Sequence, residues 1–450
     1  MAFNRPRYAR ADETTKDGDV TVDRFLMRRR AMLVGGLGLA AAGALAACGS
    51  SGTSASAASG AASNSAAATT DATASTDADV ATGPEYHEAS ASNTALSAGP
   101  WTGSIGDKEV TLNGAYIVDG ITATIDGGTY ESTSADEAVF LVVNGGALTV
   151  TNARINKSGD ASTDGEHGVD DSYSFYGLNS AVVVVGDSSS ASVDQTTLTT
   201  DASGANAVVA TGGATAEVTA SAIATTGESS RGLHATYAGT ITGADLTITT
   251  EGAHCAAVAT DRGSGTVTVD GTNTFTTAGD GSPCIYSTGE ITVSGLTGTA
   301  GQGQAIVVEG KNHATVSDST FTTDSETAGV MLYQSMSGDA ADADAATEAS
   351  TLALTNVALT CSRDVPILYV TNTTAEATLT GCTLETSGGL ATADEDRWGS
   401  SGSNGGTLTL TMDATSFDGV ITAGSTSAIT VSTTNGGAAT GATSGSVTVS

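Results

Sequence analysis

The stretch Thr315-Val316-Ser317-Asp318-Ser319-Thr320-Phe321 contains the pattern that governs most of this chain. An apolar residue, Val316, is followed by four small or polar residues and then by a second apolar residue, Phe321. The same phrase recurs, and its first members most often lie about 25 residues apart. The copies, two of them looser, are Ile125/Tyr130, Val150/Ile155, Val193/Leu198, Val218/Ile223, Ile241/Leu246, Val269/Phe275, Ile291/Leu296, Val316/Phe321, Leu354/Leu359, Leu379/Leu384 and Met412/Phe417.

A second kind of short run lies between these phrases, for example Ala207-Val208-Val209-Ala210-Thr211 and Ala305-Ile306-Val307-Val308-Glu309. Alternating runs bounded by Gly, Asn, Asp and Ser predict short β-strands. A fixed period of this length indicates a repeat architecture, and it is too short for a propeller blade of about 40–45 residues. The sequence therefore predicts an all-β fold, a right-handed single-stranded parallel β-helix (a solenoid) of about 11 rungs stacked roughly 4.8 Å apart.

The composition fits such a fold and excludes several partners. The 450 residues include 57 Gly, aromatic residues make up only 4%, and the formal net charge is −33. Binding of nucleic acid, or docking of the protein surface on anionic lipid, requires basic patches, so neither is expected of this chain.

The first 95 residues predict export and anchoring. Arg28-Arg29-Arg30 precedes an apolar run that ends in Leu45-Ala46-Ala47-Cys48-Gly49. A basic start, an apolar centre and small residues at the end describe an export signal. Residues 1–47 are expected to be that signal, residues 48–95 a Ser/Ala/Thr-rich disordered tether, and residues 96–450 the β-helix domain.

Three resemblances refine this interpretation. Arg29-Arg30-Ala31-Met32-Leu33 resembles a twin-arginine signal, with ordinary Sec export as the alternative. Leu45 to Gly49 resembles the bacterial lipobox, which implies lipidation of Cys48 and anchoring on the outer face of the cell membrane. The rungs over roughly residues 105–435 resemble right-handed β-helix proteins of the pectate-lyase-like class, and together with the lipobox they look like adhesin-like surface lipoproteins. Such rungs specify architecture and not activity.

Acidic residues on turns that follow the second strand run suggest one kind of chemistry. Hydrolysis of a glycosidic bond needs two carboxylates about 5–9.5 Å apart. Asp261, Glu309 and Asp339 are the catalytic candidates, and stacking would place Asp261 and Glu309 two rungs apart. The alternative is that the turns of a very acidic protein carry carboxylates by default.

Two further chemistries are weighed. A lyase would need Arg or Lys beside a uronate, yet no pectate-lyase catalytic motif is found. No cofactor is indicated, although Ca²⁺ could bind the acidic insertions that hold Asp342-Ala343-Asp344 and Asp164-Gly165-Glu166. Neither run forms a recognisable calcium loop, and a solvated charge run is the alternative.

Aromatic residues concentrate in two insertions of a chain that has few elsewhere. Trp398, Tyr173, Phe175 and Tyr176, with Arg262 on a nearby turn, are the candidate ligand-binding residues, because a flat ring suits a sugar face. The alternative is that the rings fold down over the core.

The remaining cysteines and histidines suggest no further site. Cys255, Cys284, Cys361 and Cys382 do not share a register position, which predicts buried thiols and not disulfides. The separate histidines His234, His254 and His313 are expected to be surface polar residues, because they lack metal-ligand spacing.

Taken together, these patterns favour a surface-anchored lipoprotein that acts as an adhesin or glycan-binding module, with an extracellular glycan or a host surface as its partner. The alternative is a polysaccharide-degrading enzyme, a glycoside hydrolase or lyase, on the same fold. A third possibility is a passive spacer at the cell surface.

Overall fold

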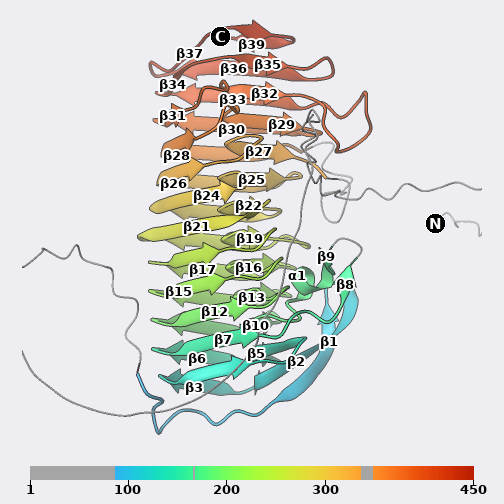
Figure 1. Cartoon of the computed structure of the whole chain (residues 1–450), viewed down its shortest axis with the longest axis vertical. Helices are drawn as coiled ribbons and strands as arrows, with labels where there is room; N and C mark the ends of the chain where they lie inside the picture. Colours follow the sequence, from blue (N-terminus) through green and yellow to red (C-terminus); the bar gives the residue numbers. More distant parts are fainter. Residues whose placement is uncertain (1–86, 166–167, 336–347) are drawn as a thin grey trace, which may run out of the picture. The chain divides into compact units, whose positions relative to one another are not determined.

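The computed structural model describes residues 87–165, 168–335 and 348–450, all of which belong to the compact unit Ala81–Ser450. They form a parallel β-helix, in which most coils add one strand to each of three stacked ladders (Figure 1). Within the described residues the only helix is the five-residue α1 (Ser172–Tyr176). The predicted β-helix is confirmed, with about 13 coils in place of about 11.

Sheet A is the first ladder. Its strands β2 to β38 pair in parallel from coil to coil, and β1 adds an antiparallel strand at one edge. The strands are β1 (Gly99–Ile105), β2 (Lys108–Asp119), β5 (Glu137–Val143), β10 (Val182–Val185), β13 (Val208–Thr211), β16 (Leu233–Thr236), β19 (Val258–Thr260), β22 (Ile285–Ser287), β25 (Ile306–Glu309), β27 (Val330–Tyr333), β29 (Leu368–Thr371), β32 (Ala391–Ala393), β35 (Ile421–Ala423) and β38 (Thr443–Ser444).

Ladder B follows sheet A along the chain, and its strands also pair in parallel. They are β3 (Thr122–Asp126), β6 (Ala147–Thr151), β11 (Ser190–Asp194), β14 (Thr215–Thr219), β17 (Thr240–Ala244), β20 (Thr266–Asp270), β23 (Glu290–Ser294), the first halves of β26 (His313–Thr323) and β28 (Ser350–Cys361), β30 (Thr374–Thr380), β33 (Thr407–Asp413), β36 (Ala428–Thr434) and β39 (Val447–Val449).

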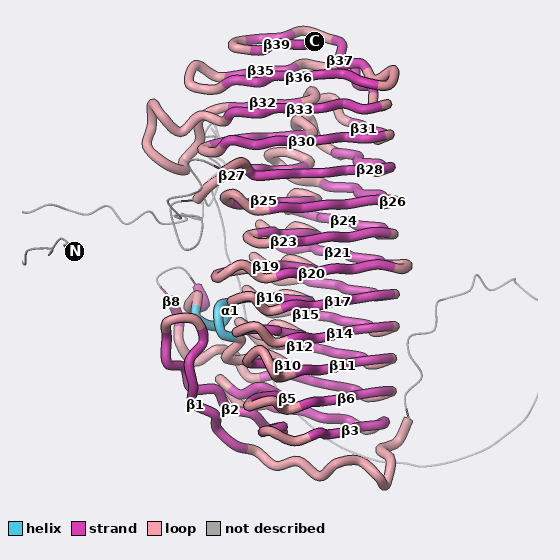
Figure 2. Tube along the Cα trace, turned by 180° about the vertical axis from the view of Figure 1, so that it is seen from behind, coloured by secondary structure: helices cyan, strands magenta, loops and turns pink. Residues whose placement is uncertain are grey.

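Ladder C completes the coils up to β31 (Figure 2). Its strands are β4 (Thr129–Ser132), β7 (Arg154–Ser158), β12 (Thr197–Asp201), β15 (Ala222–Thr225), β18 (Thr247–Thr250), β21 (Asn273–Asp280), β24 (Leu296–Gln302), the second halves of β26 and β28, and β31 (Thr383–Glu385). Above β31 the strands β34 (Ser416–Asp418) and β37 (Ala438–Thr440) form a separate pair. An antiparallel pair, β8 (Asp164–Gly165) and β9 (Gly168–Val169), lies in the first insertion.

The repeated phrase spans the turn between ladders B and C. Val193 in β11 and Leu198 in β12 both point into one continuous apolar core. The polar residues between the two apolar positions close the turn. The Oγ atom of Ser221 accepts a hydrogen bond from the N–H of Thr196 at 3.0 Å, and the Oγ of Ser319 accepts one from the N–H of Leu296 at 3.1 Å. Each hydroxyl thus satisfies a backbone group that the turn removes from the ladder.

Each such turn also contains at least one residue with positive φ, the conformation that Gly and Asn adopt most readily. The residues at this position are Gly127, Asn152, Gln195, Ala220, Asp245, Gly271, Gly295, Asp318, Asn356, Gly381, Ala414 and Asn435.

The strand pairing shifts two of the predicted copies of the phrase, Ile241/Leu246 and Ile291/Leu296, by two residues. Ile241 pairs with Ala216 and Val267, so that Gly243 and not Ile241 stacks on Val218. In the same way Val293 and Gly298, and not Ile291 and Leu296, occupy the phrase positions. Large neighbours occupy the space that the two glycines leave, since a Cβ at Gly243 would meet Leu246 and one at Gly298 would meet Phe321.

The two coils that the sequence pattern missed lie at the end of the described chain. There β36 keeps the apolar Val431, but its partner β37 presents only Ala438-Ala439-Thr440. Alanine in place of a large apolar residue removes the second half of the phrase. The last coil, β38 and β39, is shorter still.

A second apolar cluster covers the outer face of sheet A over the first coils. Leu141, Val183 and Val209 point outward and pack under β1, β2 and residues that follow α1. The cluster also includes the partly buried Trp101 and Tyr237. This explains why the strands β5, β10 and β13 are buried on both sides.

Part of the segment 87–95 pairs with β3 in the first coil, although the sequence predicts that these residues belong to the tether. The N–H of Ser90 donates to the carbonyl of Asp126 at 2.8 Å, and that of Thr94 to Thr124 at 3.0 Å. The export signal, Cys48 and the rest of the tether lie outside the described residues. In the part of the chain that is described, no helix has the length and apolar character needed to cross a bilayer.

Candidate functional site

The two candidate catalytic carboxylates that are described lie on the outer surface of sheet A. Glu309 ends β25, in which Ile306 and Val308 point into the core and Val307 does not, so alternation turns Glu309 outward. Asp261 directly follows β19. One coil, that of Thr288, lies between them, which separates the two backbone positions by about 10 Å. Asp339 lies outside the described residues.

Glu309 is buried beneath two tyrosines that the sequence did not single out. The hydroxyl of Tyr333 donates to Glu309 Oε2 at 2.7 Å, and the hydroxyl of Tyr286 donates to the same oxygen. Glu309 is only 5% exposed. Burial raises the pKa of both tyrosines well above its usual value, and the charge of Glu309 adds to the effect. Both phenols therefore stay protonated and available as donors.

Asp261 occupies a different environment. Its Oδ2 lies 3.7 Å from a guanidinium nitrogen of Arg231, and its Oδ1 accepts the N–H of Arg262 at 2.9 Å. Burial nevertheless raises the pKa of Asp261 to about 6, against the lowering by Arg231 and by the Arg262 N–H. The charges of Glu309 and Asp171 raise this pKa further. Asp261 can thus carry a proton at mildly acidic pH.

The first insertion brings three of the candidate aromatic residues to sheet A. The guanidinium carbon of Arg262 lies 4.2 Å from the centre of the Phe175 ring, so these two candidates are in contact. Tyr176 stacks on Tyr237 with ring centres 5.6 Å apart and planes 7° apart. Tyr173 is 1% exposed, and its hydroxyl donates to Asp136 at 2.5 Å. The Tyr173 ring therefore lies in the interior of the insertion.

The insertion is fixed to β16 by polar contacts. The Nε2 atom of His234 lies 2.9 Å from the carbonyl oxygen of Ser174, and the hydroxyl of Thr236 donates to the carbonyl of Phe175 at 2.9 Å. Arg231 donates to the hydroxyl of Ser174. The expectation that His234 is a surface residue is wrong, because these contacts bury it completely. Burial, with the nearby charge of Arg231, holds the pKa of His234 well below its usual value.

The loop between β32 and β33 brings the fourth candidate aromatic residue, Trp398, to the other end of the same surface. The rings of Trp398 and Tyr333 have centres 5.1 Å apart at 45°, and the guanidinium carbon of Arg397 lies 4.6 Å from the Trp398 ring centre. The side-chain amide of Asn404 donates to the carbonyls of Asp396 and Trp398 and fixes this loop. Trp398 therefore borders the Glu309 cluster through Tyr333.

The structure thus gathers the predicted residues into two neighbouring groups. One group is Asp261, Arg262 and Phe175, and the other is Glu309 with Trp398. The first insertion and the loop after β32 project from the same side of the stack, and the coils of β19, β22 and β25 lie between them (Figures 1 and 2). Tyr176 lies apart and lines a hollow of about 370 Å³ between β2 and α1. Register could have found Tyr333, which pairs directly with Glu309.

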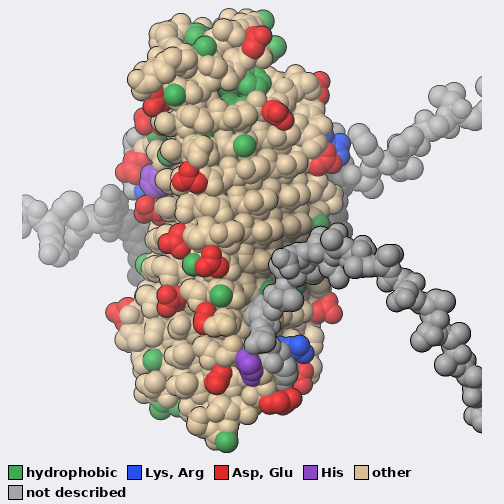
Figure 3. Space-filling view, turned by 90° about the vertical axis from the view of Figure 1, so that its left-hand side faces the viewer, with side chains coloured by type: hydrophobic (Ala, Val, Ile, Leu, Met, Phe, Trp, Pro, Cys, Tyr) green, Lys and Arg blue, Asp and Glu red, His purple; other side chains and the backbone are tan. Residues whose placement is uncertain are grey.

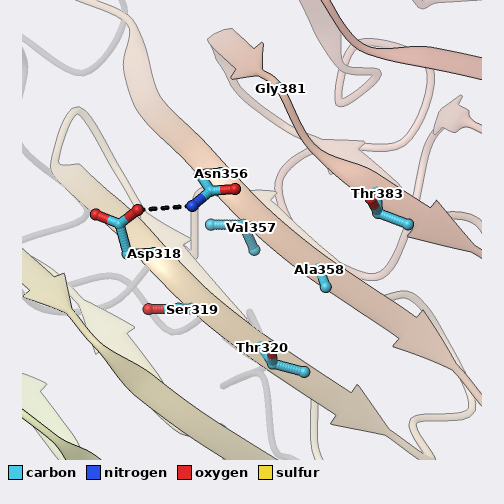
Figure 4. Close-up of a pocket in the computed structure, with 8 residues that line it drawn as sticks. All are labelled: Asp318, Ser319, Thr320, Asn356, Val357, Ala358, Gly381 and Thr383. Carbon is cyan, nitrogen blue, oxygen red and sulfur yellow. Dashed lines mark hydrogen bonds between the residues drawn. The ribbon is translucent and has the colours of Figure 1, made fainter.

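A second candidate site lies on ladder C and was not predicted. A hollow of about 280 Å³ opens where the turns of β26, β28 and β31 stack (Figure 4). The amide of Asn356 donates to a carboxylate oxygen of Asp318 at 2.7 Å at its margin. A Cβ on Gly381 would meet nothing within 4 Å, so the missing side chain there leaves space. The hollow is lined by Asp318, Ser319, Thr320, Asn356, Val357, Ala358, Gly381 and Thr383.

Metal and thiol chemistry can be judged for the described residues. Among them no three His, Cys, Asp or Glu side chains are grouped so that they could hold a metal ion. The acidic run Asp342-Ala343-Asp344 lies outside the described residues, as do the side chains of Asp164 and Glu166. The prediction for the four cysteines is confirmed, because Cys255, Cys284, Cys361 and Cys382 are all buried free thiols. Burial raises the pKa of each thiol, so none is an activated nucleophile.

Comparison with known proteins found no matching family model, no matching curated protein and no matching solved structure. The fold assignment therefore rests on the strand pairing described above.

Proposed function

We propose that this chain is an adhesin-like surface lipoprotein with a β-helix of the pectate-lyase-like class. It binds an extracellular glycan that belongs to a host surface or to the surrounding matrix, and the binding site is the outer face of sheet A. The observation that carries the proposal is the arrangement of Trp398 and Tyr333 beside the carboxylate of Glu309. Ring faces and fixed hydrogen-bonding groups are the combination that recognises the apolar and polar sides of a sugar. Asp261, Arg262 and Phe175 would extend this surface by about two coils.

Attachment to the membrane would follow from Cys48. The lipobox-like Leu45 to Gly49 supports lipidation of this cysteine after removal of residues 1–47. A Ser/Ala/Thr-rich tether would then hold the β-helix away from the lipid. The negative charge of the protein would also keep the β-helix away from anionic surfaces. Replacing Cys48 by Ser should release the protein into the culture medium and abolish labelling by a radioactive fatty acid. Labelling that persists in Cys48→Ser would contradict the anchor.

Hydrolysis is the second candidate, and the environment of Asp261 favours it. A carboxyl whose pKa is about 6 can donate a proton to the glycosidic oxygen as the bond to the anomeric carbon breaks. Glu309 would take a proton from the water whose oxygen bonds to that carbon. The backbone positions of Asp261 and Glu309 are about 10 Å apart, slightly more than the about 6.5–9.5 Å that separates the two carboxyl groups of inverting enzymes.

One experiment separates binding from hydrolysis. The purified full-length chain is incubated with neutral, basic and acidic polysaccharides, and both retention on each polymer and new reducing ends are measured in the same samples. Retention without new ends, lost in Trp398→Ala and kept in Trp101→Ala, supports binding at sheet A. New reducing ends that disappear in Glu309→Gln would replace binding by hydrolysis. Neither retention nor new ends on any polymer would refute both functions and leave a passive role.

A further inference from the structure

The outer surface of ladder C carries a regular array of threonines. Four consecutive strands each present two outward threonines, and strand pairing stacks them in two columns. All are exposed or half-buried. The pairs are Thr247/Thr249 in β18, Thr274/Thr276 in β21, Thr297/Thr299 in β24 and Thr320/Thr322 in β26. Neighbouring members lie about 4.8 Å apart between coils and about 6.7 Å apart along a strand.

This array has no charge in a protein whose formal net charge is −33. The same two columns continue as Ala222 and Ala224 below and as Ala358 and Thr360 above. Figure 3 faces the side of the stack at which the ladder C strands β12, β15, β21 and β31 are labelled in Figure 1. A broad area in that view carries neither charged nor hydrophobic side chains, and acidic side chains collect beside it.

The polar hollow of Figure 4 lies at one end of the array. Thr320 belongs to both, and Ala358 continues the first column into the hollow. Asp318 and Asn356 add a carboxylate and an amide at the margin, and they already hold each other through one hydrogen bond. The array and the hollow together form a continuous polar surface across the strands β18 to β31, which we call the threonine track.

We propose that the threonine track binds a single chain of an uncharged polysaccharide, with one sugar unit seated in the hollow between Asp318, Asn356 and Ala358. This inference does not depend on the function proposed for sheet A, because the two surfaces belong to different ladders of the coil. If both bind, the protein would hold two glycan chains at once and crosslink them.

Three properties of the track select this class of ligand. Each threonine offers a hydroxyl that donates and accepts, together with a methyl group, and these match the hydroxyl and C–H groups of a sugar. A β-branched side chain has few rotamers, so little entropy is lost when the ligand orders it. The threonines offer no counter-charge to a charged polymer, and an anionic polymer is repelled by Asp318 and by the net charge of the protein.

The test uses Ala358→Tyr, which fills the hollow, and Ala353→Tyr as its matched control. Both alanines lie in β28 and are half-buried, but Ala353 faces outward from ladder B. The purified full-length chain and both variants are run through native gels that contain amylose, galactan, mannan or xylan, and through gels with polygalacturonate. Circular dichroism and the melting temperature establish that the variants are folded.

We expect at least one neutral polymer to retard the wild type, with about tenfold weaker binding in Ala358→Tyr, equivalent to about 1.4 kcal/mol. Ala353→Tyr should stay within about twofold of the wild type. Asp318→Ala should also weaken binding in a protein that is still folded; its melting temperature should fall modestly, because Ala is disfavoured at the positive φ of this turn and Asn356 loses its hydrogen-bond partner. Equal retardation of the two tyrosine variants, retardation only by polygalacturonate, or retardation by no neutral polymer would each overturn the proposal. Loss of binding in Trp398→Ala, with Ala358→Tyr unaffected, would instead assign all binding to sheet A.

Discussion

Phe321 and Gly298 stack in adjacent coils inside ladder C, and their coupling gives a sharp test of the register. They pair directly, and Phe321 is 1% exposed. A Cβ at Gly298 would lie 2.6 Å from Cδ1 of the Phe321 ring, so the ring uses the space that the glycine leaves. Phe321→Ala should therefore lower the free energy of unfolding by about 4 kcal/mol, since Gly298 has no side chain to relax into the cavity.

The effect of Gly298→Ala on the unfolding free energy should change sign when Phe321 is also replaced. Gly298→Ala alone forces the Phe321 ring to move and should cost about 2 kcal/mol, as overpacking does. In Phe321→Ala the same methyl enters the cavity and should recover about 1 kcal/mol, near the value of one buried methylene. The double variant should thus lose about 3 kcal/mol, half of the sum of about 6 kcal/mol expected for independent sites.

The four proteins are compared by urea unfolding followed by circular dichroism, with the slope of the transition required to stay constant. Gly99→Ala is the control for a glycine that has room, because its Cβ would meet Ile117 only at ordinary contact distance, 3.4 Å. If the effects of the Phe321 and Gly298 substitutions add within about 0.5 kcal/mol, the two residues do not share space and the register of ladder C is refuted.

Three further predictions concern the outer face of sheet A. Tyr333→Phe removes a donor from the buried Glu309 and should lower the unfolding free energy by about 2 kcal/mol. The control is Tyr369→Phe, which should cost less than about 0.5 kcal/mol, because the hydroxyl of Tyr369 lies 3.2 Å from the exposed Asp396. Equal losses by urea titration would contradict this. Because the pKa of Asp261 is raised from 3.8 to about 6, its stabilising contribution is present below pH 3.8 and lost as pH rises through 6. The difference in unfolding free energy between the wild type and Asp261→Asn should therefore fall by about 3 kcal/mol over that interval, and a constant difference would refute this. The pKa of His234 is lowered from 6.5, so its stabilising contribution is present above pH 6.5 and lost as pH falls. The wild type should therefore lose stability between pH 6.5 and 5 relative to His234→Gln, in which the amide can still donate to Ser174. Parallel plots of unfolding free energy against pH would contradict this.

The inward side of the coils could be predicted from the sequence because it obeys one local rule. A large apolar residue on each side of the turn between ladders B and C is visible wherever Val, Leu, Ile or Phe occupies both positions. The rule fails at Gly243 and Gly298, because a neighbour fills the space, Leu246 from the same turn and Phe321 from the adjacent coil, and the pattern shifts by two residues. It fails again at β36 and β37, where Ala438 and Ala439 are too small to be noticed.

The outward side could be predicted only in part. Stacking correctly placed Asp261 and Glu309 on one surface, because coil register is a property of the repeat. It could not show that Glu309 is held by tyrosines, since Tyr286 and Tyr333 belong to coils 23 and 24 residues away. Aligning Glu309 with its neighbour in the next coil would have found Tyr333, whereas Tyr286 pairs with Val307 and reaches Glu309 diagonally.

The docking of the first insertion lay beyond any such alignment, and it changes what sheet A can do. His234 contacts Ser174 across 60 residues, and this contact converts an apparently exposed histidine into a buried one. The same docking brings Phe175 over Arg262 and places Asp171 close enough to raise the pKa of Asp261. The pKa of Asp261 is therefore raised in part by an insertion that leaves the coil four strands of sheet A earlier, between β5 and β10. Burial is the largest cause of the raised pKa of Asp261, and the charge of Asp171 adds to it from a segment that the repeat itself does not specify.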